Sequence, residues 1–334
     1  MGDSQIYTDV LMAIVWMIVG VVGSYGLYWA LDKLIHFLPA QLQEKLKVLG
    51  FITPAAVLVI LILVLPLFQT VIWSFMDDKG KEFVGIQNFI DLFANNDFIN
   101  ILINNFLWVA VVPAITVGFG TLFATLGNQV GPTREKVFKS LIFMPMTISF
   151  VSASTIWAYI YVYSAPGRPE IGLLNTIYKN LTGAKDGLIW MQIENFRLNS
   201  FLLMAVVVWL QVGYSMVIIS AGIKAVPEET IEAARIDGAN GMQVFFRIIV
   251  PQIAGTLMSV FVTVLILVMK IFDIILAMTG GNFNTNVLAF EYYKQFFVNS
   301  NLGPASAVVT ILLILIAPLM WLQIRTVRHQ ESLR

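Results

Sequence analysis

The sequence predicts an all-helical protein that crosses a membrane about seven times. Of its 334 residues, 58% are hydrophobic and only 12% are charged, whereas soluble domains carry roughly 25% charged residues. A chain this apolar would expose large hydrophobic patches in water. In lipid, long apolar runs must form helices, because no water is available to pair with exposed backbone groups.

Seven apolar stretches reach the roughly 20 residues that a membrane span requires. They lie at about 10–31, 51–75, 99–127, 139–163, 200–222, 247–277 and 303–325. The longer stretches predict tilt or a helical extension beyond the bilayer. Prolines inside or near the ends of these helices predict kinks; they are Pro54, Pro66, Pro113, Pro145, Pro251 and Pro318. The first stretch is expected to be a retained membrane helix, because residues 1–9 lack the Lys and Arg of a secretory signal.

The basic residues predict the orientation of the chain. Loops 32–50, 128–139 and 223–247 and the C-terminal tail hold twelve Lys and Arg, against seven in the longer segments on the other side. The positive-inside rule places the first set in the cytoplasm, so the N-terminus is expected outside and the C-terminus inside. Acidic and basic residues balance at 20 each, which indicates no nucleic-acid partner.

The local structure of one expected cytoplasmic loop, residues 225–251, can be predicted from its residues. Pro227 suits the first turn of a helix, and Glu229 lies at the positive end of that helix dipole. Gly238 can adopt the left-handed conformation that ends a helix, and Asn240 can cap the next one. The loop is therefore expected to form a short helix, a sharp turn and a second helix, which together project a compact knob into the cytoplasm.

The residues of this loop resemble a known family. Glu232-Ala-Ala, then Asp237-Gly-Ala, then Ile248 and Pro251, is similar to the EAA loop of permease subunits in bacterial ATP-binding-cassette (ABC) importers. In that family the loop is the coupling helix that docks on the ATPase subunit. Val250 departs from the leucine that usually precedes the proline. The resemblance implies that coupling depends on Glu229, Glu232, Ala233, Ala234, Asp237, Gly238 and Ala239.

The resemblance covers about residues 51–325. Three further segments resemble the carbohydrate-uptake branch and its maltose-permease-like subunit: residues 83–89 (Phe-Val-Gly-Ile-Gln-Asn-Phe), 172–175 (Gly-Leu-Leu-Asn) and 272–281, although Asn282 replaces the usual proline. The implied organisation is a six-helix type I permease core at 51–325 that carries the EAA loop. It is preceded by an extra N-terminal helix and cytoplasmic linker at 1–50 and followed by a cytoplasmic tail at 326–334.

The resemblance implies a permease subunit of a binding-protein-dependent importer in the bacterial inner membrane, forming half of the path for a sugar or sugar-like solute. The implied partners are two copies of an ABC ATPase, a second homologous permease and a periplasmic or lipid-anchored solute-binding protein. ATP and Mg would be bound by the ATPase, because this chain has no phosphate-binding Gly-x-x-x-x-Gly-Lys-Ser/Thr motif. No cofactor, metal or catalytic residue is predicted on the chain, since it has no cysteine and only two histidines.

The solute path is predicted from polar residues inside spans, which are costly enough to suggest function. Gln211, Tyr214 and Trp209 of span 200–222 could supply hydrogen bonds and aromatic stacking to a sugar, and the stretch 209–214 resembles the helix that lines the maltose site. Lys270 and Asp273 are three residues apart and are expected on one helical face. An alternative explanation for Lys270 and Asp273 is an ion pair near the outer interface. An alternative explanation for Gln211 is a hydrogen bond between helices.

Two other functions are alternatives to that of an importer subunit. An ion-coupled secondary transporter would use Lys270 and Asp273 as a relay, but it would leave the knob at 225–241 unexplained. A membrane-embedded enzyme would need histidine or metal-ligand clusters, which the sequence lacks. The sequence is compatible with several solutes: an oligosaccharide, a disaccharide such as an α-glucoside or trehalose, a polyol-linked glucoside, or glycerol phosphate.

Overall fold

The computed structural model describes residues 3–36 and 40–332, which are nearly all helical. Within this part of the chain there is no β-strand, only an isolated bridge between Met76 and Phe83. The all-helical prediction is therefore confirmed. The chain divides into two compact units, residues 1–70 and 71–334, which are described separately.

The first unit holds two apolar helical spans, Tyr7–Lys33 and Val48–Trp73, the second of which runs on past residue 70. They are formed by α1 (Asp3–His36), α2 (Ala40–Val59), a π-helical turn η1 (Ile60–Val64) and α3 (Leu65–Trp73). α1 packs on α2, with the rings of Tyr28 and Phe51 stacked 5.7 Å apart. Most apolar side chains of these two spans are exposed, as a lipid solvent allows, whereas Ile35 of α1 is buried.

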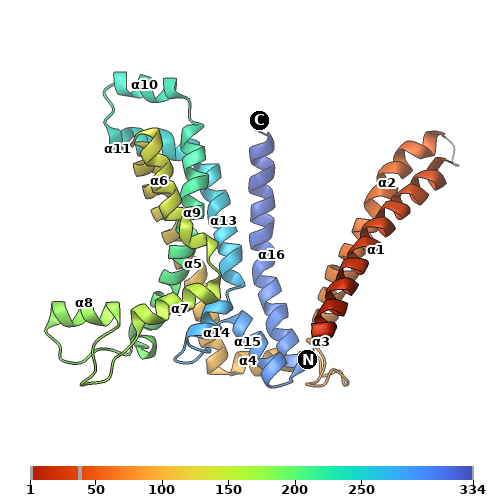
Figure 1. The fold of residues 1–334 in the computed structure, drawn as a ribbon, viewed down its shortest axis with the longest axis horizontal. Coiled ribbons are helices and arrows are strands. Elements are labelled where there is room, and N and C mark those ends of the chain that lie inside the picture. The colour runs from red at the N-terminus through yellow and green to blue at the C-terminus, as the bar shows by residue number, and fades with distance from the viewer. Residues whose placement is uncertain (1–2, 37–39, 333–334) are drawn as a thin grey trace. The chain divides into compact units, whose positions relative to one another are not determined.

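The second unit is a helical bundle (Figure 1). Its α-helices are α4 (Gln87–Ala94), α5 (Asn96–Asn128), α6 (Pro132–Phe143), α7 (Phe150–Tyr161), α8 (Leu173–Thr182), α9 (Leu198–Lys224), α10 (Glu228–Ile236), α11 (Gly241–Val244), α12 (Val250–Gln252), α13 (Ala254–Met269), α14 (Asp273–Met278), α15 (Leu288–Tyr293) and α16 (Leu302–Ser332). Short 3₁₀ or π turns connect them: η2 (Met144–Thr147), η3 (Trp190–Gln192), η4 (Asn195–Arg197), η5 (Phe245–Ile249) and η6 (Lys294–Val298). In Figure 1, α10 lies at one end of this unit and α4, α14 and α15 lie at the other.

The expected seven spans are found, but two of them are bent. Five helices in the described part are long and apolar enough to cross a membrane, and two bent helix pairs raise the number to seven. The fourth span bends by 101° between η2 and α7, and the sixth by 68° between α12 and α13. The expectation of one helix over 247–277 is therefore wrong, because α13 begins at Ala254 and ends at Met269.

Proline explains where two helices widen. A π turn directly precedes Pro66, and another precedes Pro251. A proline ring clashes with the carbonyl four residues earlier in a regular α-helix, and proline also has no N–H to donate. The wider turn moves that carbonyl aside, so the chain continues as a helix through the proline.

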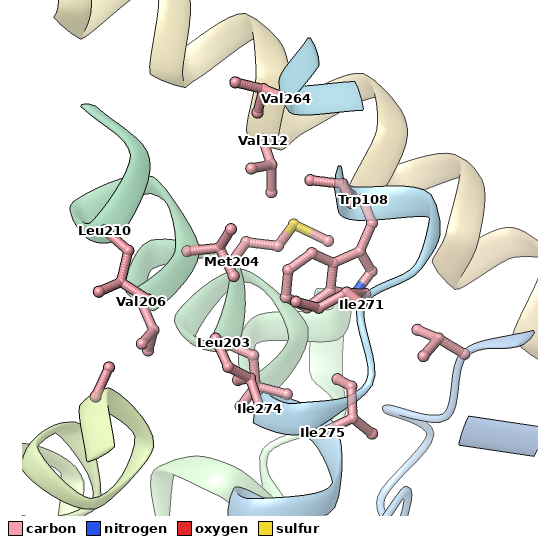
Figure 2. Close-up of a cluster of buried hydrophobic side chains, with 14 of the residues drawn as sticks. Trp108, Val112, Leu203, Met204, Val206, Leu210, Val264, Ile271, Ile274 and Ile275 are labelled. Atoms are coloured by element: carbon pink, nitrogen blue, oxygen red, sulfur yellow. The ribbon is translucent and has the colours of Figure 1, made fainter. Parts of the chain in front are cut away.

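The core of the second unit lies where α5, α9 and α13 pack together. Trp108 of α5 is fully buried beside Met204 of α9 and Ile271, which follows α13 (Figure 2). Lipid is as apolar as these side chains, so close packing rather than the hydrophobic effect holds such helices together. This core lies between α10 at one end of the unit and α4, α14 and α15 at the other (Figure 1).

Two buried asparagines fasten the outer segments. Asn88 donates from Nδ2 to the carbonyl oxygens of Ser74 and Met76, at 2.9 and 2.7 Å. Asn175 donates to the carbonyl oxygens of Val162 and Leu188, both at 3.0 Å, and accepts from the Leu188 backbone N–H. Both asparagines belong to the sequence motifs that resemble the carbohydrate-uptake permeases. Each one connects two backbone segments through side-chain hydrogen bonds.

Candidate functional site

The knob predicted at 225–241 is present and is built around α10. Pro227 is the residue just before α10, and Glu228 and Glu229 occupy its first turn. Their carboxylates lie at the positive end of the helix dipole, where negative charge is favourable. No residue of α10 is buried, and its one substantial neighbour is α11. α10 therefore stands clear of the bundle, as Figure 1 shows.

The turn after α10 depends on Gly238. Its φ is +83°, a left-handed conformation that residues with a Cβ rarely adopt. The N–H groups of Gly238 and Ala239 donate to the carbonyls of Arg235 and Ala234, at 3.1 and 2.9 Å. This pair of bonds is the Schellman motif, which satisfies carbonyls at a helix end. The prediction that Gly238 ends the helix is confirmed.

Asn240 starts the helix that returns to the membrane. Its Oδ1 accepts from the Gln243 N–H at 2.9 Å, and Gln243 Oε1 accepts from the Asn240 N–H at 2.8 Å. This reciprocal capping box satisfies two otherwise unpaired donors. The expected cap is confirmed, so both ends of the turn have a defined conformation.

One face of α10 is free for a partner. Glu229, Glu232, Ala233 and Ile236 recur at the spacing of a single helical face, and all four are exposed. We call these four residues the docking face. Ile236 is 86% exposed and was not among the residues predicted from sequence, although its position seven residues after Glu229 is a signal that could have found it.

The other predicted coupling residues lie in the turn or on the inner side of the knob. Asp237 and Gly238 are exposed, whereas Ala234 and Ala239 are half-buried. Ala234 therefore lies outside the docking face. Its carbonyl accepts the hydrogen bond from Ala239 that closes the turn.

A polar cluster from three helices holds the base of the knob, and sequence reasoning missed it. Glu135 of α6 accepts from Lys139 at 2.5 Å and from Lys224, the last residue of α9. Lys139 also donates to Ser220, which donates to Asn128 of α5 at 2.7 Å. The i,i+4 spacing of Glu135 and Lys139 is the sequence signal that could have indicated the pair. The cluster joins α5, α6 and α9 just before the chain enters α10.

The residues predicted for the solute path on α9 do not gather. Trp209 lines an apolar cavity of about 440 Å³ with Phe119, Phe201 and Val212. Gln211 is two residues away, about 200° around the helix, and is only 7% exposed. The side chains of Trp209 and Gln211 therefore lie on different sides of α9, and their place on the solute path stays a prediction.

Gln211 is mostly buried, but its amide makes no hydrogen bond with the described residues and is not fully enclosed. The hydroxyl of Ser215, one turn further along α9, is buried without a partner. Tyr214 is half-buried against the core. Hydrogen bonding within the described part of the chain therefore does not account for Gln211, whose amide is available to a ligand or a second chain.

Lys270 and Asp273 do not share a helical face. α13 ends at Met269, Lys270 is its cap, and Asp273 begins α14. Within the described part of the chain they form no ion pair with each other. Lys270 is exposed and Asp273 is half-buried. The helix break between them explains why the spacing rule failed.

The region that the structure describes holds no group of three His, Asp or Glu side chains that could bind a metal ion. The geometry at 225–241 is that of a contact element, with a rigid turn and a free helical face. The expected function therefore depends on a partner that receives this face.

Known proteins resemble this chain over most of its length. The family described as binding-protein-dependent transport system inner membrane component matches residues 116–329. The osmoprotective compounds uptake permease protein GgtC of Synechocystis is 43% identical over 85% of this chain and all of its own length. The α-glucoside transport system permease protein AglF of Rhizobium meliloti is 38% identical over 97% of this chain and 99% of its own.

A solved structure shares the fold. A chain in the crystal structure of a bacterial ABC transporter involved in the import of the acidic polysaccharide alginate superposes with a TM-score of 0.73. The match covers 86% of this chain and 97% of that chain, at 17% sequence identity.

Proposed function

This chain belongs to the family of binding-protein-dependent transport system inner membrane components, and on that premise we propose that it forms half of the translocation path for a sugar or sugar-like solute. It is the transmembrane permease subunit of an ABC importer, a multi-pass protein of the inner membrane with the type I permease fold. In this family the ATPase activity lies in a partner subunit. The family membership does not support the alternative of an ion-coupled secondary transporter.

The solute class is proposed from the relatives. One relative is named for osmoprotective compounds and another for α-glucosides. We propose a neutral glucoside or a polyol-linked glucoside as the solute of this chain. Gln211 is the leading candidate for a solute contact, because its amide makes no hydrogen bond with the described residues and is not fully enclosed. Tyr214 is proposed beside it, while Trp209, Lys270 and Asp273 are retained as secondary positions along the path.

Coupling to ATP hydrolysis is proposed to pass through the docking face of α10. The single observation that carries this proposal is an exposed helix that ends in a rigid turn and stands clear of the bundle. Glu232 would meet a cationic or hydrogen-bonding group on the ATPase, and Ile236 would bury its apolar side chain there. Ala234, Asp237, Gly238 and Ala239 would keep the turn in shape, and Ala233 would allow close approach of the ATPase.

The cluster around Glu135 is proposed to transmit the motion. Closure of the ATPase dimer would move the knob, and a flexible base would absorb that movement. Glu135 bridges Lys139 of its own helix and Lys224 of α9, so a displacement of α10 would move α6 and α9 together. This link connects the coupling loop to the helices that carry the proposed solute path.

The assembly and topology are proposed as follows. The chain would pair with a second homologous permease, two copies of an ABC ATPase and a periplasmic or lipid-anchored solute-binding protein, and would bind no cofactor itself. Residues 51–325 would form the permease domain, 1–50 an added helix and linker, and 326–334 a tail. The N-terminus would be outside and the C-terminus cytoplasmic, so reporter fusions at the two ends should report opposite sides; same-side results would refute this orientation.

The coupling proposal is tested by changing the turn alone. Gly238→Val forces a β-branched residue to φ +83° and should distort the turn at about 1–3 kcal/mol. Gly238→Asn is the matched control, because asparagine tolerates the left-handed conformation. In a reconstituted complex we expect Gly238→Val and Glu232→Lys to abolish both uptake and solute-stimulated ATP hydrolysis, and Gly238→Asn to retain them.

Two further measurements complete this test. Co-purification of the ATPase shows whether a variant has lost contact or only coupling. The solute-binding protein should bind its solute equally well in every case. Wild-type coupling in both Gly238→Val and Glu232→Lys would mean that this loop is not the transmission element.

A further inference from the structure

A polar cavity of about 290 Å³ lies at the end of the second unit that is opposite to α10. Two stretches far apart in the sequence build it: residues 92–104, from the end of α4 into α5, and residues 281–295, from the loop after α14 to the junction of α15 with η6. Its polar walls are mostly amides and include Asn95, Asn100, Asn104, Asn286, Glu291 and Gln295. Such a lining contrasts with the apolar cavity beside Trp209.

The walls of this cavity are held rigidly by hydrogen bonds. Asn104 is 1% exposed and donates to the carbonyl oxygens of Asn284 and Asn286, at 2.6 and 2.8 Å. The guanidinium of Arg197 donates to the side-chain oxygen of Asn104 and to that of Asn100, the latter at 3.0 Å. A site preorganised in this way loses little entropy when a ligand binds.

Strained backbone flanks the same cavity. Phe196, Arg197, Phe283 and Asn284 all have φ between 54° and 56°. Left-handed non-glycine residues persist only where the surrounding structure determines them, and they cluster at ligand clamps and active sites. This strain is consistent with a ligand-binding site. The evidence for the site itself is the arrangement of polar groups in the cavity.

Hydrogen-bonding groups in the cavity are left unused. Glu291 is 7% exposed and accepts from the amides of Asn286 and Gln295, both at 2.7 Å. Within the described residues it has no cationic partner, and a carboxylate offers about four acceptor positions. The Oδ1 of Asn286 is buried without a partner. Lys294 lines the cavity and forms no ion pair in this part of the chain.

These groups define the chemistry of the ligand. It must donate hydrogen bonds to Glu291 and Asn286 and accept one from Lys294, as adjacent hydroxyl groups do. The two carboxylates of Glu291 and Asp97 balance the cations of Lys294 and Arg197, so the cavity has no net positive charge to favour an anion over a neutral ligand. Small-molecule sites range over about 300–1,000 Å³, so a cavity of about 290 Å³ suits a single ring or a short polyol rather than an oligosaccharide.

We propose that this cavity is an outer subsite that binds one neutral polyhydroxylated unit of the solute. It would receive the solute at the outer face, before the solute reaches the level of Gln211 in the membrane. The inference rests on the proposed function for its solute class, but it concerns a site that no part of the coupling argument uses.

The test measures binding directly in the assembled complex, reconstituted in nanodiscs without the solute-binding protein. Saturation-transfer difference NMR detects weak binding of methyl α-glucoside, with sn-glycerol 3-phosphate as the anionic comparison. Lys294→Met removes a donor without breaking a hydrogen bond of the fold, and Asn286→Leu removes the free acceptor together with the amide that donates to Glu291. Lys185→Met and Asn180→Leu are the matched controls, because both residues are exposed and neither lines the cavity.

We expect wild type and both controls to bind methyl α-glucoside in preference to the phosphate. Each cavity variant should weaken that binding about five-fold, the effect of losing one hydrogen bond. If Asn286→Leu fails to fold, Lys294→Met decides the matter alone. Absence of glucoside binding in wild type, or equal binding in Lys294→Met and wild type, would overturn the assignment.

Two other outcomes separate this inference from its alternatives. If Lys294→Met leaves glucoside binding unchanged but weakens capture of the solute-binding protein, the cavity is a protein contact and the inference is wrong. ATP-driven glucoside uptake by the complete wild-type importer is measured in parallel. Normal uptake with no binding at the cavity refutes the subsite alone, whereas absent uptake refutes the proposed solute class.

Discussion

Gly213 should be irreplaceable, because α9 approaches the bent fourth span there without room for a side chain. A Cβ added at Gly213 would lie 2.5 Å from the carbonyl oxygen of Ile142 and 2.6 Å from the Cα of Phe143. Both are backbone atoms, which no rotamer change can move. Nonbonded carbon atoms pack at about 3.5–4.0 Å, so Gly213→Ala would require a backbone displacement of about 1 Å.

The net cost follows from two opposing effects. Overpacking of this kind costs about 1–3 kcal/mol. Replacing glycine by alanine inside a helix returns about 0.5–1 kcal/mol. The expected net loss is about 1–2 kcal/mol, which corresponds to a fall in Tm of about 2–8 °C for a domain of this size.

Gly118→Ala of α5 is the matched control, because an added Cβ there has nothing within 4 Å. Thermal unfolding of the purified complex, followed by size-exclusion fluorescence, compares the two variants. Gly118→Ala should be neutral or slightly stabilised, while Gly213→Ala should unfold earlier and lose uptake. Equal stability of the two variants would refute the close contact between α9 and the bent span.

Three other outcomes are expected. Glu135→Gln leaves two lysines without a counter-charge, so the free energy of unfolding of the bundle should fall by about 1–3 kcal/mol. The amount of solute imported per ATP hydrolysed should fall as well, and an unchanged import-to-hydrolysis ratio would contradict the transmission link. Gln211→Leu breaks no hydrogen bond of the fold, so stability should hold while half-saturation for uptake rises about five-fold; an unchanged half-saturation places the solute elsewhere. The hydrogen bond from Lys179 lowers the pKa of the Glu170 carboxyl, so their contact holds at neutral pH and is lost only in acid, as pH falls through that lowered pKa. Because the chain has no cysteine, a single spin label can be attached at exposed Leu181 to report the loss of this ion pair. Acid should increase the mobility of the label, and Lys179→Met should increase it at pH 7. Unchanged spectra in both experiments would contradict the role of the pair.

Short-range chemistry made the spans and the knob predictable. Span positions follow from the length of apolar runs, because lipid leaves the backbone no alternative to a helix. The turn at Gly238 and the cap at Asn240 are set by residues within five positions of each other, so local hydrogen-bonding rules sufficed. The exposed Ile236 also follows from helical spacing alone.

Contacts between distant segments decided the rest. The sequence by itself determined an all-helical membrane protein, its seven spans and the local form of the coupling loop, because each depends on a few neighbouring residues. Only the tertiary structure placed Trp209 beside an apolar cavity, broke the helix between Lys270 and Asp273, and joined Glu135 to Lys224 across 89 positions. Likewise, the carbonyls of Asn284 and Asn286 meet Asn104 from 180 and 182 positions away. Such pairings depend on how helices pack, and packing is a property of the whole chain rather than of any local pattern.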